Sequence, residues 1–157
     1  MGEELRRART IPLTRIEHVG SEIFLFRADL LEAGVKRSIG RGLLAHYLET
    51  EKIKSSTRAV VVHGAGNTVT GVKLATEELR LSAKVLAVVY AETSARVIQN
   101  LVARGIEVVA AAPRREGREG RLSAAQELCL KELGYVLIEQ HEKPLIVDIQ
   151  RETFGLR

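Results

Sequence analysis

The sequence has few of the residues on which common site types depend. Its 157 residues include one cysteine, one methionine and no tryptophan, and aromatic residues make up 4% of the chain. The single cysteine, Cys129, excludes an internal disulfide framework and a cysteine-rich zinc site. It falls within a helical pattern, where a buried cysteine packs as a small apolar residue. The scarcity of aromatic rings argues against stacking platforms for single-stranded nucleic acid.

Long apolar runs are also lacking. No segment reaches the roughly 20 apolar residues that a membrane-spanning helix needs. The N-terminal segment 1–10, "MGEELRRART", is charged and differs from a signal peptide in this respect. These features predict a cytoplasmic protein with no membrane segment. Low aromatic and methionine content, together with much Arg and Glu, is compatible with a thermophilic source.

Charged residues, in contrast, are plentiful. The chain has 24 Lys and Arg against 20 Asp and Glu, which gives a net charge of +4. The two signs are mixed along most of the chain, and the densest basic stretch, "PRREGREGR" (113–121), is interrupted by glycines and glutamates. This composition favours a solvated loop. A nucleic-acid partner, which should show as salt-dependent retention on DNA, is therefore the weakest hypothesis.

Strand-like and helix-like segments alternate from residue 58 to residue 140, and the hydrophobic content of 45% is enough for one domain with a real core. We predict strands at 59–65, 84–91, 106–112 and 135–140, and helices at 34–52, 67–81, 93–105 and 122–134. The alternation predicts an α/β fold, namely a three-layer α/β/α domain with a mainly parallel four-stranded sheet and right-handed crossovers.

Two shorter strands precede this core, at 11–16 and 22–28, with His18 in the turn between them. Within a single domain, we assign residues 10–33 to an N-terminal strand segment, 34–143 to the core and 144–157 to a C-terminal tail. Thr93 or Ser94 is expected to cap the helix at 93–105, Gly105 to end it, and Ser123 to open the helix at 122–134.

The turn "HGAGNT" (63–68) follows a predicted buried strand and opens a helix. In open parallel sheets, ligands bind beyond the carboxyl ends of the strands. Gly64 and Gly66 let a ligand approach the backbone, and the free amides of the helix start favour an anion. Asn67 and Thr68 add polar side chains. The alternative is a tight turn in which Asn67 or Thr68 caps the helix, and on these residues alone we favour that alternative.

The turn matches neither of two common phosphate-binding motifs. No Lys follows its glycines, as a Walker A motif would require, and the spacing from Gly66 to Gly71 is too long for GxGxxG. The histidines at 46, 63 and 141 are far apart in the sequence and form no metal-ligand pattern, so we predict no metal site. No nucleophile elbow is present either.

Lys36, in "LLEAGVKRSIGRG", is the second candidate site residue. A lysine beside a glycine at a helix start is usually solvated. It could instead condense with an aldehyde, if burial lowered its pKa.

Taken in order, the segments resemble the N-terminal, small-domain part of the cysteine synthase family, which comprises pyridoxal-phosphate enzymes of the tryptophan synthase β type (fold type II). The similar segments are "IPLTRI" (11–16), "GVKRS" (34–38), "GAGNTVTG" (64–71), "YAETSARVI" (90–98) with "GIEVVAA" (105–111), and "EQHEKPLIVDIQRETFGL" (139–156). Their family counterparts include "TPLVRL", "SVKDR" and "TSGNTG". The resemblance covers nearly the whole chain from about residue 10 and implies the fold predicted above.

The resemblance also implies site residues. Lys36 matches the lysine that carries pyridoxal phosphate, and Asn67 matches an asparagine that contacts substrate and cofactor. The substrate-carboxylate loop of the family corresponds to Gly64, Ala65, Gly66, Asn67 and Thr68. Glu152, Thr153 and Gly155 match a further family motif.

Several departures from the family pattern bear on function. Gly64 and Ala65 replace a Thr and a Ser, so two hydroxyl donors are lost. Arg37 and Ser38 replace the Asp and Arg that follow the family lysine, and residues 30–31 replace an Asn-Pro. In the family, the loop that holds the cofactor phosphate belongs to a C-terminal half that has no counterpart in this sequence. A lysine without that loop would hold the cofactor weakly, because most of its positioning comes from the surrounding protein.

Two hypotheses follow. In the first, the chain is a stand-alone small domain that acts as a binding or regulatory module for a small anionic or amino-acid ligand. In the second, it is a pyridoxal-phosphate-dependent β-replacement enzyme completed by a partner chain that resembles the large domain. In either case, an uncovered apolar surface predicts a homodimer or larger assembly, formed through the N-terminal segment or the part after Pro144.

Overall fold

The structure is a computed structural model that describes residues 13–18, 20–141 and 143–154. The strands are β1 (Leu13–His18), β2 (Ser21–Phe26), β3 (Ala59–His63), β4 (Lys84–Tyr90), β5 (Glu107–Ala112) and β6 (Tyr135–Leu137). The helices are η1 (Ala28–Leu30), α2 (Val35–Glu49), α3 (Asn67–Glu78), α4 (Ala95–Ala103), η2 (Arg114–Glu116), α5 (Gly117–Lys131) and α6 (Lys143–Phe154). The predictions for residues 1–12 and for Gly155 lie outside the described residues.

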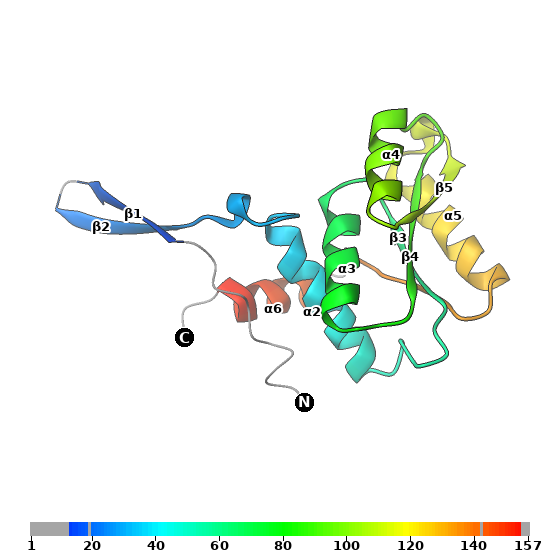
Figure 1. Ribbon diagram of the computed structural model, residues 1–157, viewed down its shortest axis with the longest axis horizontal. Coiled ribbons are helices and arrows are strands. Elements are labelled where there is room, and N and C mark those ends of the chain that lie inside the picture. Colours follow the sequence, from blue (N-terminus) through cyan, green and yellow to red (C-terminus); the bar gives the residue numbers. More distant parts are fainter. Residues whose placement is uncertain (1–12, 19, 142, 155–157) are drawn as a thin grey trace.

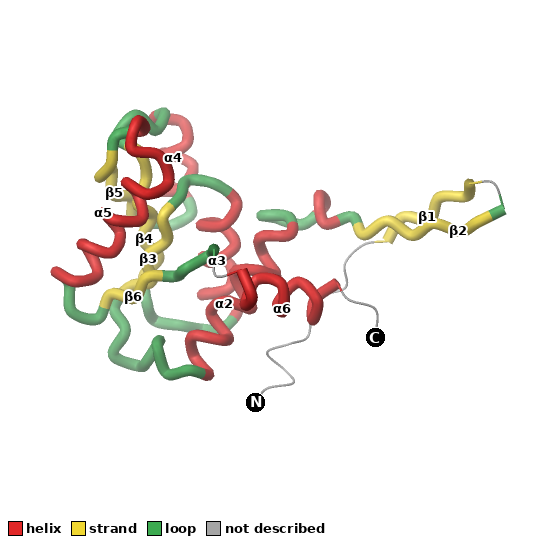
Figure 2. Tube along the Cα trace, turned by 180° about the vertical axis from the view of Figure 1, so that it is seen from behind, coloured by secondary structure: helices red, strands yellow, loops and turns green. Residues whose placement is uncertain are grey.

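The predicted α/β core is confirmed. Four parallel strands form one sheet in the order β5-β4-β3-β6. Helix α5 covers one face, where Ala125 packs with Val61, Leu86 and Val88. Helices α3 and α4 lie on the other face, which carries the larger apolar cluster (Figures 1 and 2). The strands read as continuous apolar runs because helices bury both faces of the sheet.

The chain changes the direction in which it adds strands at β3, which makes this strand a topological switch point of the sheet. From β3 the chain adds β4 and then β5 on one side, and it later returns to add β6 on the other side of β3. Crevices at such points, beyond the carboxyl ends of the strands, are the usual ligand sites of open α/β sheets. The turn 63–68 begins with the last residue of β3 and therefore starts at this point.

Helix α2 packs against α3, and α6 packs on α2. Ile39, Leu43 and Leu44, which the helical spacing predicts as apolar contacts, are all buried here. The contact with α6 is formed by Ile149, which is 7% exposed and packs over Gly42. Residues 144–154, part of the segment 144–157 assigned to a tail from the sequence, thus belong to a helix that joins the packed body.

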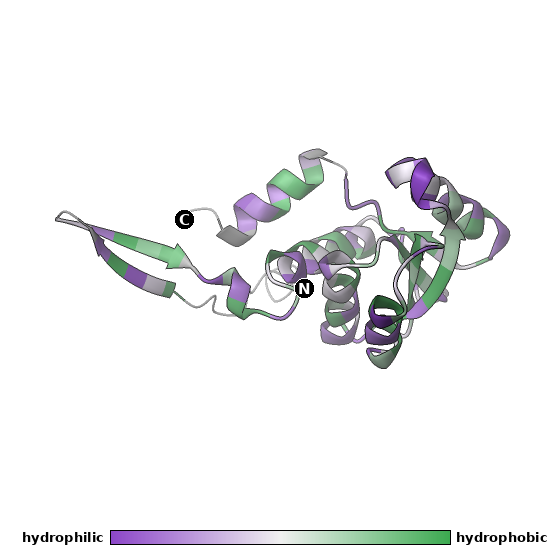
Figure 3. Cartoon of the chain, turned by 90° about the horizontal axis from the view of Figure 1, so that it is seen from above, coloured by the Kyte–Doolittle hydropathy of each residue, from purple (hydrophilic) through white to green (hydrophobic). Residues whose placement is uncertain are grey.

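The two N-terminal strands pair with each other and lie apart from the rest of the protein. β1 and β2 form an antiparallel hairpin with the register Leu13↔Phe26 to His18↔Ser21. In Figure 1 the hairpin projects away from the sheet, and in Figure 3 apolar residues, drawn in green, lie along it. His18 is the last residue of β1, so the prediction that it lies in the turn is wrong.

Two predictions about the segment from Pro113 to Ser123, a helix start and a loop, also need correction. Helix α5 begins at Gly117, six residues before Ser123, so the basic stretch 113–121 is not a loop but η2 followed by the first turns of α5. Its Arg121 guanidinium packs 4.0 Å over the ring of Tyr90. Glutamate and arginine are good helix formers, and this contact anchors the segment, which explains why helix propensity prevails over the glycines.

Helix α4 agrees more closely with its prediction. Ser94 directly precedes the helix, although its side chain makes no capping hydrogen bond, and Gly105 follows the end of the helix with a positive φ of 68°. That conformation favours glycine over other residues. Among the described residues, no helix is both long and apolar enough to cross a bilayer.

Candidate functional site

A cavity of about 580 Å³ lies where α2 and α3 begin. Its lining comprises Ala28, Asp29, Ala33, Gly34, Val35, Lys36, Gly66, Asn67 and Thr68. The fold therefore brings Lys36 together with three residues of the turn, although 30 positions separate them in the sequence. Gly64 and Ala65, the other two predicted residues of the loop, are not among the lining residues.

The first turn of α3 leaves its polar groups available. Gly66 occupies the N-cap position, and no side chain makes a capping hydrogen bond. The prediction that Asn67 or Thr68 caps the helix is therefore wrong, because both residues already lie inside the helix. The amides of Val69 and Thr70 turn back to the Gly66 carbonyl oxygen, at 3.1 and 3.4 Å. Within the described part of the chain, the amides and side chains of Asn67 and Thr68 have no protein acceptor and can donate to a ligand.

The electrostatics of the cavity favour an anion. Two helix N-termini, those of α2 and α3, adjoin the cavity, and each contributes the partial positive charge of its helix dipole. Lys36 adds an ammonium group. Asp29 also lines the cavity, but Arg27 donates two hydrogen bonds to it, at 2.8 and 2.7 Å, and these hold the Asp29 pKa below its ordinary value.

Two glycines set the position of Lys36 relative to α3. A Cβ on Gly40 would lie 2.5 Å from the Gly71 carbonyl carbon, and a Cβ on Gly71 would overlap the backbone carbonyl of Lys36. No side chain other than hydrogen fits at either position, because the facing atoms are backbone and cannot rotate away. The close approach of the two helices therefore places Lys36 beside the start of α3.

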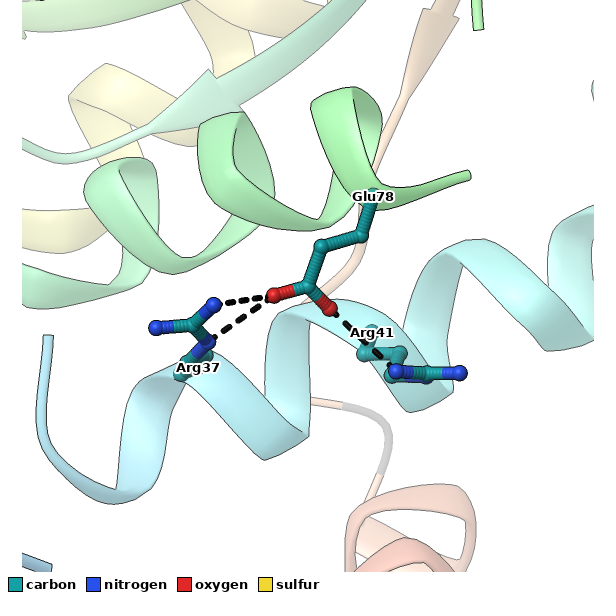
Figure 4. A network of polar contacts seen from close by, with 3 residues as sticks. All are labelled: Arg37, Arg41 and Glu78. Carbon is teal, nitrogen blue, oxygen red and sulfur yellow. Dashed lines mark hydrogen bonds and ion pairs between the residues drawn. The ribbon is translucent and has the colours of Figure 1, made fainter. Parts of the chain in front are cut away.

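A polar network on the same helix pair adds to this packing (Figure 4). The Glu78 carboxylate accepts hydrogen bonds from Nε of Arg37, at 3.0 Å, and from Nη2 of the same residue. It also accepts one from Nη1 of Arg41, at 3.3 Å. All three side chains are mostly buried, with exposures of 17 to 21%. One carboxylate thus bridges two guanidinium groups of α2. Arg37 replaces the aspartate of the family motif, and here it joins two helices.

A second polar cluster, which the sequence analysis missed, surrounds His63 at the end of β3. His63 is buried, and its Nε2 lies 3.2 Å from Oε1 of Glu139, while the Gln140 side chain donates to the His63 carbonyl oxygen at 3.0 Å. The ring of His141 lies 5.5 Å from the ring of His63. Burial lowers the pKa of His63, and the hydrogen bond to Glu139 acts in the opposite direction.

The order of the strands explains this cluster. His63 is the last residue of β3, and residues 139–141 follow the end of β6, the neighbouring strand of the sheet. Carboxyl ends of adjacent parallel strands meet at one edge, so the pairing of β3 with β6 would have indicated the contact. Among the described side chains, no group of three His, Cys, Asp or Glu residues could hold a metal ion.

The remaining predicted residues lie elsewhere. Cys129 is half-buried and packs against the apolar cluster of α5, as expected, and burial raises the pKa of its thiol. Such a thiol reacts slowly, since the thiolate is the nucleophile. Glu152 and Thr153 fall in helix α6.

Comparison with protein-family models and with curated proteins found no match. Solved structures, in contrast, share the fold. The O-acetylserine-dependent cystathionine β-synthase of Helicobacter pylori matches 92% of this chain with a TM-score of 0.71 at 23% identity. The O-acetylserine sulfhydrylase isoform 3 of Entamoeba histolytica matches 95% with a TM-score of 0.75 at 17% identity. The cystathionine β-synthase of Bacillus anthracis matches 83% with a TM-score of 0.67 at 25% identity.

The chain spans about half the length of these structures, namely 51%, 46% and 49% in the same order. At such low identity, the similarity concerns the fold. This chain has the fold of one half of the solved cysteine synthase and cystathionine β-synthase enzymes. The fold implied by the resemblance in the sequence is therefore confirmed.

Proposed function

We propose that this chain is a cysteine-synthase-like small domain that binds a small anionic or amino-acid ligand and is not self-sufficient in catalysis. It would act in the cytoplasm as a binding or regulatory module. The observation that carries the proposal is the cavity, which Lys36 lines together with Asn67 and Thr68, two residues whose amides and side chains have no partner within the described part of the chain.

A carboxylate fits these groups best. It can accept hydrogen bonds from the first amides of α3 while the Lys36 ammonium compensates its charge. The loop has lost the two family hydroxyls at Gly64 and Ala65, and neither residue lines the cavity. Recognition would therefore rest on backbone amides, Asn67 and Thr68, which suits a small ligand of modest affinity.

The residues fit pyridoxal phosphate in part. When bound, that cofactor supplies an electron sink for chemistry at the β-carbon of an amino acid. Lys36 would hold it through its amine, and Asn67 would hydrogen-bond to it. Lys36 is also the one cationic side chain among the described lining residues. Once its amine is used for the cofactor aldehyde, no second cation remains among the described lining residues for the phosphate, so this cavity by itself would hold the cofactor only weakly.

A second candidate function is a pyridoxal-phosphate-dependent β-replacement enzyme completed by a partner chain. The observation in its favour is that the chain spans about half of the solved enzymes with this fold. The partner would resemble the other half and supply the phosphate-binding loop. Lys36 would then both hold the cofactor and carry the substrate proton.

One experiment separates the two. Purified protein is mixed with pyridoxal phosphate, its visible spectrum is recorded, and the mixture is reduced with borohydride before mass mapping. The binding module should show no label specific to Lys36, only diffuse labelling of surface lysines. Specific labelling of Lys36, lost in Lys36→Ala and retained in the control Lys54→Ala, would favour the enzyme and overturn the first proposal.

Ligand binding is tested with acetate and L-serine as probes. Amide chemical shifts should change at Gly66, Asn67 and Thr68, and the changes should weaken in Lys36→Ala but not in Lys54→Ala. No shift at these amides at any accessible concentration would contradict the carboxylate site.

A further inference from the structure

The carboxyl edge of the sheet carries polar side chains that do not line the cavity of Lys36. β4 ends at Tyr90 and β3 ends at His63, and residues 139–141 follow the end of β6. Because β3 lies between β4 and β6, His63 occupies the middle of this edge. Side chains alternate along a strand, so His63 points to the face of Val61, which α5 covers. Helix α5 can therefore bring its own side chains to this edge.

Arg121 of α5 lies at this edge without an anionic partner. The central carbon of its guanidinium is 4.0 Å from the ring centroid of Tyr90, and the side chain is half-buried. Its Nε is covered and has no hydrogen-bond partner, and no described carboxylate forms an ion pair with it. A charge that is partly removed from water and left unpaired is unfavourable. An anion bound here would compensate it.

Glu139, the carboxylate of the polar cluster around His63, does not supply that anion. Its Oε1 lies 3.2 Å from Nε2 of His63, which is buried, and it forms no ion pair with Arg121. The carboxylate is therefore engaged with the imidazole, and the guanidinium remains uncompensated.

His141 reports the electrostatic character of this edge. The residue is exposed, and its ring lies 5.5 Å from the ring of His63. Partial burial lowers the pKa of His141, and the positive charges of Arg118 and Arg121 lower it further. Among the described residues, Glu139 is the one carboxylate that raises it. Cations therefore outnumber carboxylates here, and such a local potential attracts anions.

Arg118 lies one turn before Arg121 in α5 and remains open to solvent. Its side chain is 48% exposed, and the Glu119 carboxylate is 3.7 Å from its Nε, which is longer than a hydrogen bond. A guanidinium stacked on a ring still directs N–H groups outward in its own plane, so Arg121 can bind an anion without leaving Tyr90. The two arginines thus offer one half-buried and one exposed group of donors.

We propose that Arg121 and His141, with Arg118 at the rim, form a second anion subsite, and that the ligand of this protein carries a second anionic group that occupies it. A carboxylate or a phosphate fits, because a guanidinium pairs with two oxygen atoms of either group at once. The inference rests on the proposed function, in which the first carboxylate of the ligand binds at Asn67 and Thr68.

Lys36 links the two subsites. It lines the cavity, and its positive charge also lowers the pKa of His141. Water and salt screen charges, so such an effect acts only over short distances. A small acid with two anionic groups can therefore reach both subsites, whereas acetate can occupy only one of them at a time.

The test compares acetate with two acids of similar length, succinate and phosphonopropionate, by NMR titration of isotope-labelled protein. At least one of the two longer acids should bind about tenfold more tightly than acetate, as expected for an added charged hydrogen bond. It should shift both the amides of Gly66 and Asn67 and the ring signals of His141. The tighter of the two acids identifies the second group as a carboxylate or a phosphate.

Three variants separate the subsite from general attraction to positive charge. Arg121→Gln should reduce the affinity for the tighter acid to that for acetate, and should change acetate binding by less than about twofold. Arg118→Gln, which keeps the contact with Tyr90, should weaken the tighter acid about threefold. The matched control Arg115→Gln removes the same charge from an exposed position of the same basic stretch and should leave both affinities within about twofold.

Two outcomes would overturn the proposal. One is that neither longer acid binds more tightly than acetate. The other is that Arg115→Gln and Arg121→Gln weaken the longer acids equally. Failure of the proposed function would be seen separately, as acetate that shifts no amide at residues 66–68. In that event, a shift of the His141 ring by succinate that is lost in Arg121→Gln would still support the second subsite, and its absence would overturn the subsite as well.

Discussion

The hairpin and the α/β body use apolar residues in opposite ways. In the body, residues such as Leu43 and Val62 are completely buried between helices and sheet. In the hairpin, Leu13 and Phe24 are 56% and 53% exposed although they are equally apolar. The body therefore buries its apolar side chains within the described chain, whereas the hairpin leaves comparable side chains about half exposed.

The body also holds helices α2 and α3 together by close backbone and ion-pair contacts, while the hairpin is held by its own cross-strand pairs. Gly40 and Gly71 meet through backbone atoms, and Glu78 bridges Arg37 and Arg41. Stability should therefore be concentrated in the contact between α2 and α3. The same contact forms the cavity, so damage to it should reach the candidate site.

The largest expected effect is the loss of stability when a buried leucine of the body is truncated, compared with the same truncation in the hairpin. Leu43→Ala leaves a cavity in the core and should lower the free energy of unfolding by about 3–4 kcal/mol, as for other buried leucines. Leu13→Ala, in the hairpin, should change it by less than about 1 kcal/mol. Urea denaturation followed by far-UV circular dichroism measures both. Similar losses for the two variants would contradict the distinction between the regions.

A smaller effect is expected from adding one methyl group between the helices. Gly71→Ala places a Cβ against the backbone of Lys36, and should cost about 1–3 kcal/mol even after the better helix propensity of alanine is counted. Glu77→Ala, an exposed position one and a half turns further along α3, is the control and should stay within about 0.5 kcal/mol. Because the clash displaces Lys36, Gly71→Ala should also reduce the acetate-induced shifts. A neutral Gly71→Ala would mean that the two helices can separate freely.

The smallest effect concerns pH and the burial of His63. Its folded pKa is lowered, so on acidification the unfolded state binds the proton first, below about pH 6.5. The stability contributed by the neutral imidazole is therefore complete above that pH and is lost as the pH falls. Glu139 opposes this shift, while His141 and Arg121 add to it. His63→Gln should flatten the dependence of unfolding free energy on pH below 6.5, and an unchanged slope would show that other groups cause it.

Much of the fold followed from the sequence because its signals are local. The apolar run at 59–63 and the helical spacing of Ile39, Leu43 and Leu44 reflect burial by a neighbouring layer, and each is visible in a short window. The helix start at Gly117 was missed because glycine and charge indicate a loop locally, whereas the packing of Arg121 on Tyr90 involves residues far apart in the chain.

The sequence by itself determined the order of strands and helices, and hence the parallel sheet, since continuous apolar runs and the helical period of 3.6 residues are properties of the chain. Its motifs also pointed to Lys36 and Asn67. Only the tertiary structure decided that these two share a cavity, that Asn67 and Thr68 have no partner among the described residues, and that His63 lies beside Glu139 and His141. These relations depend on which helix faces and strand ends come together, and that is set by packing between segments distant in sequence.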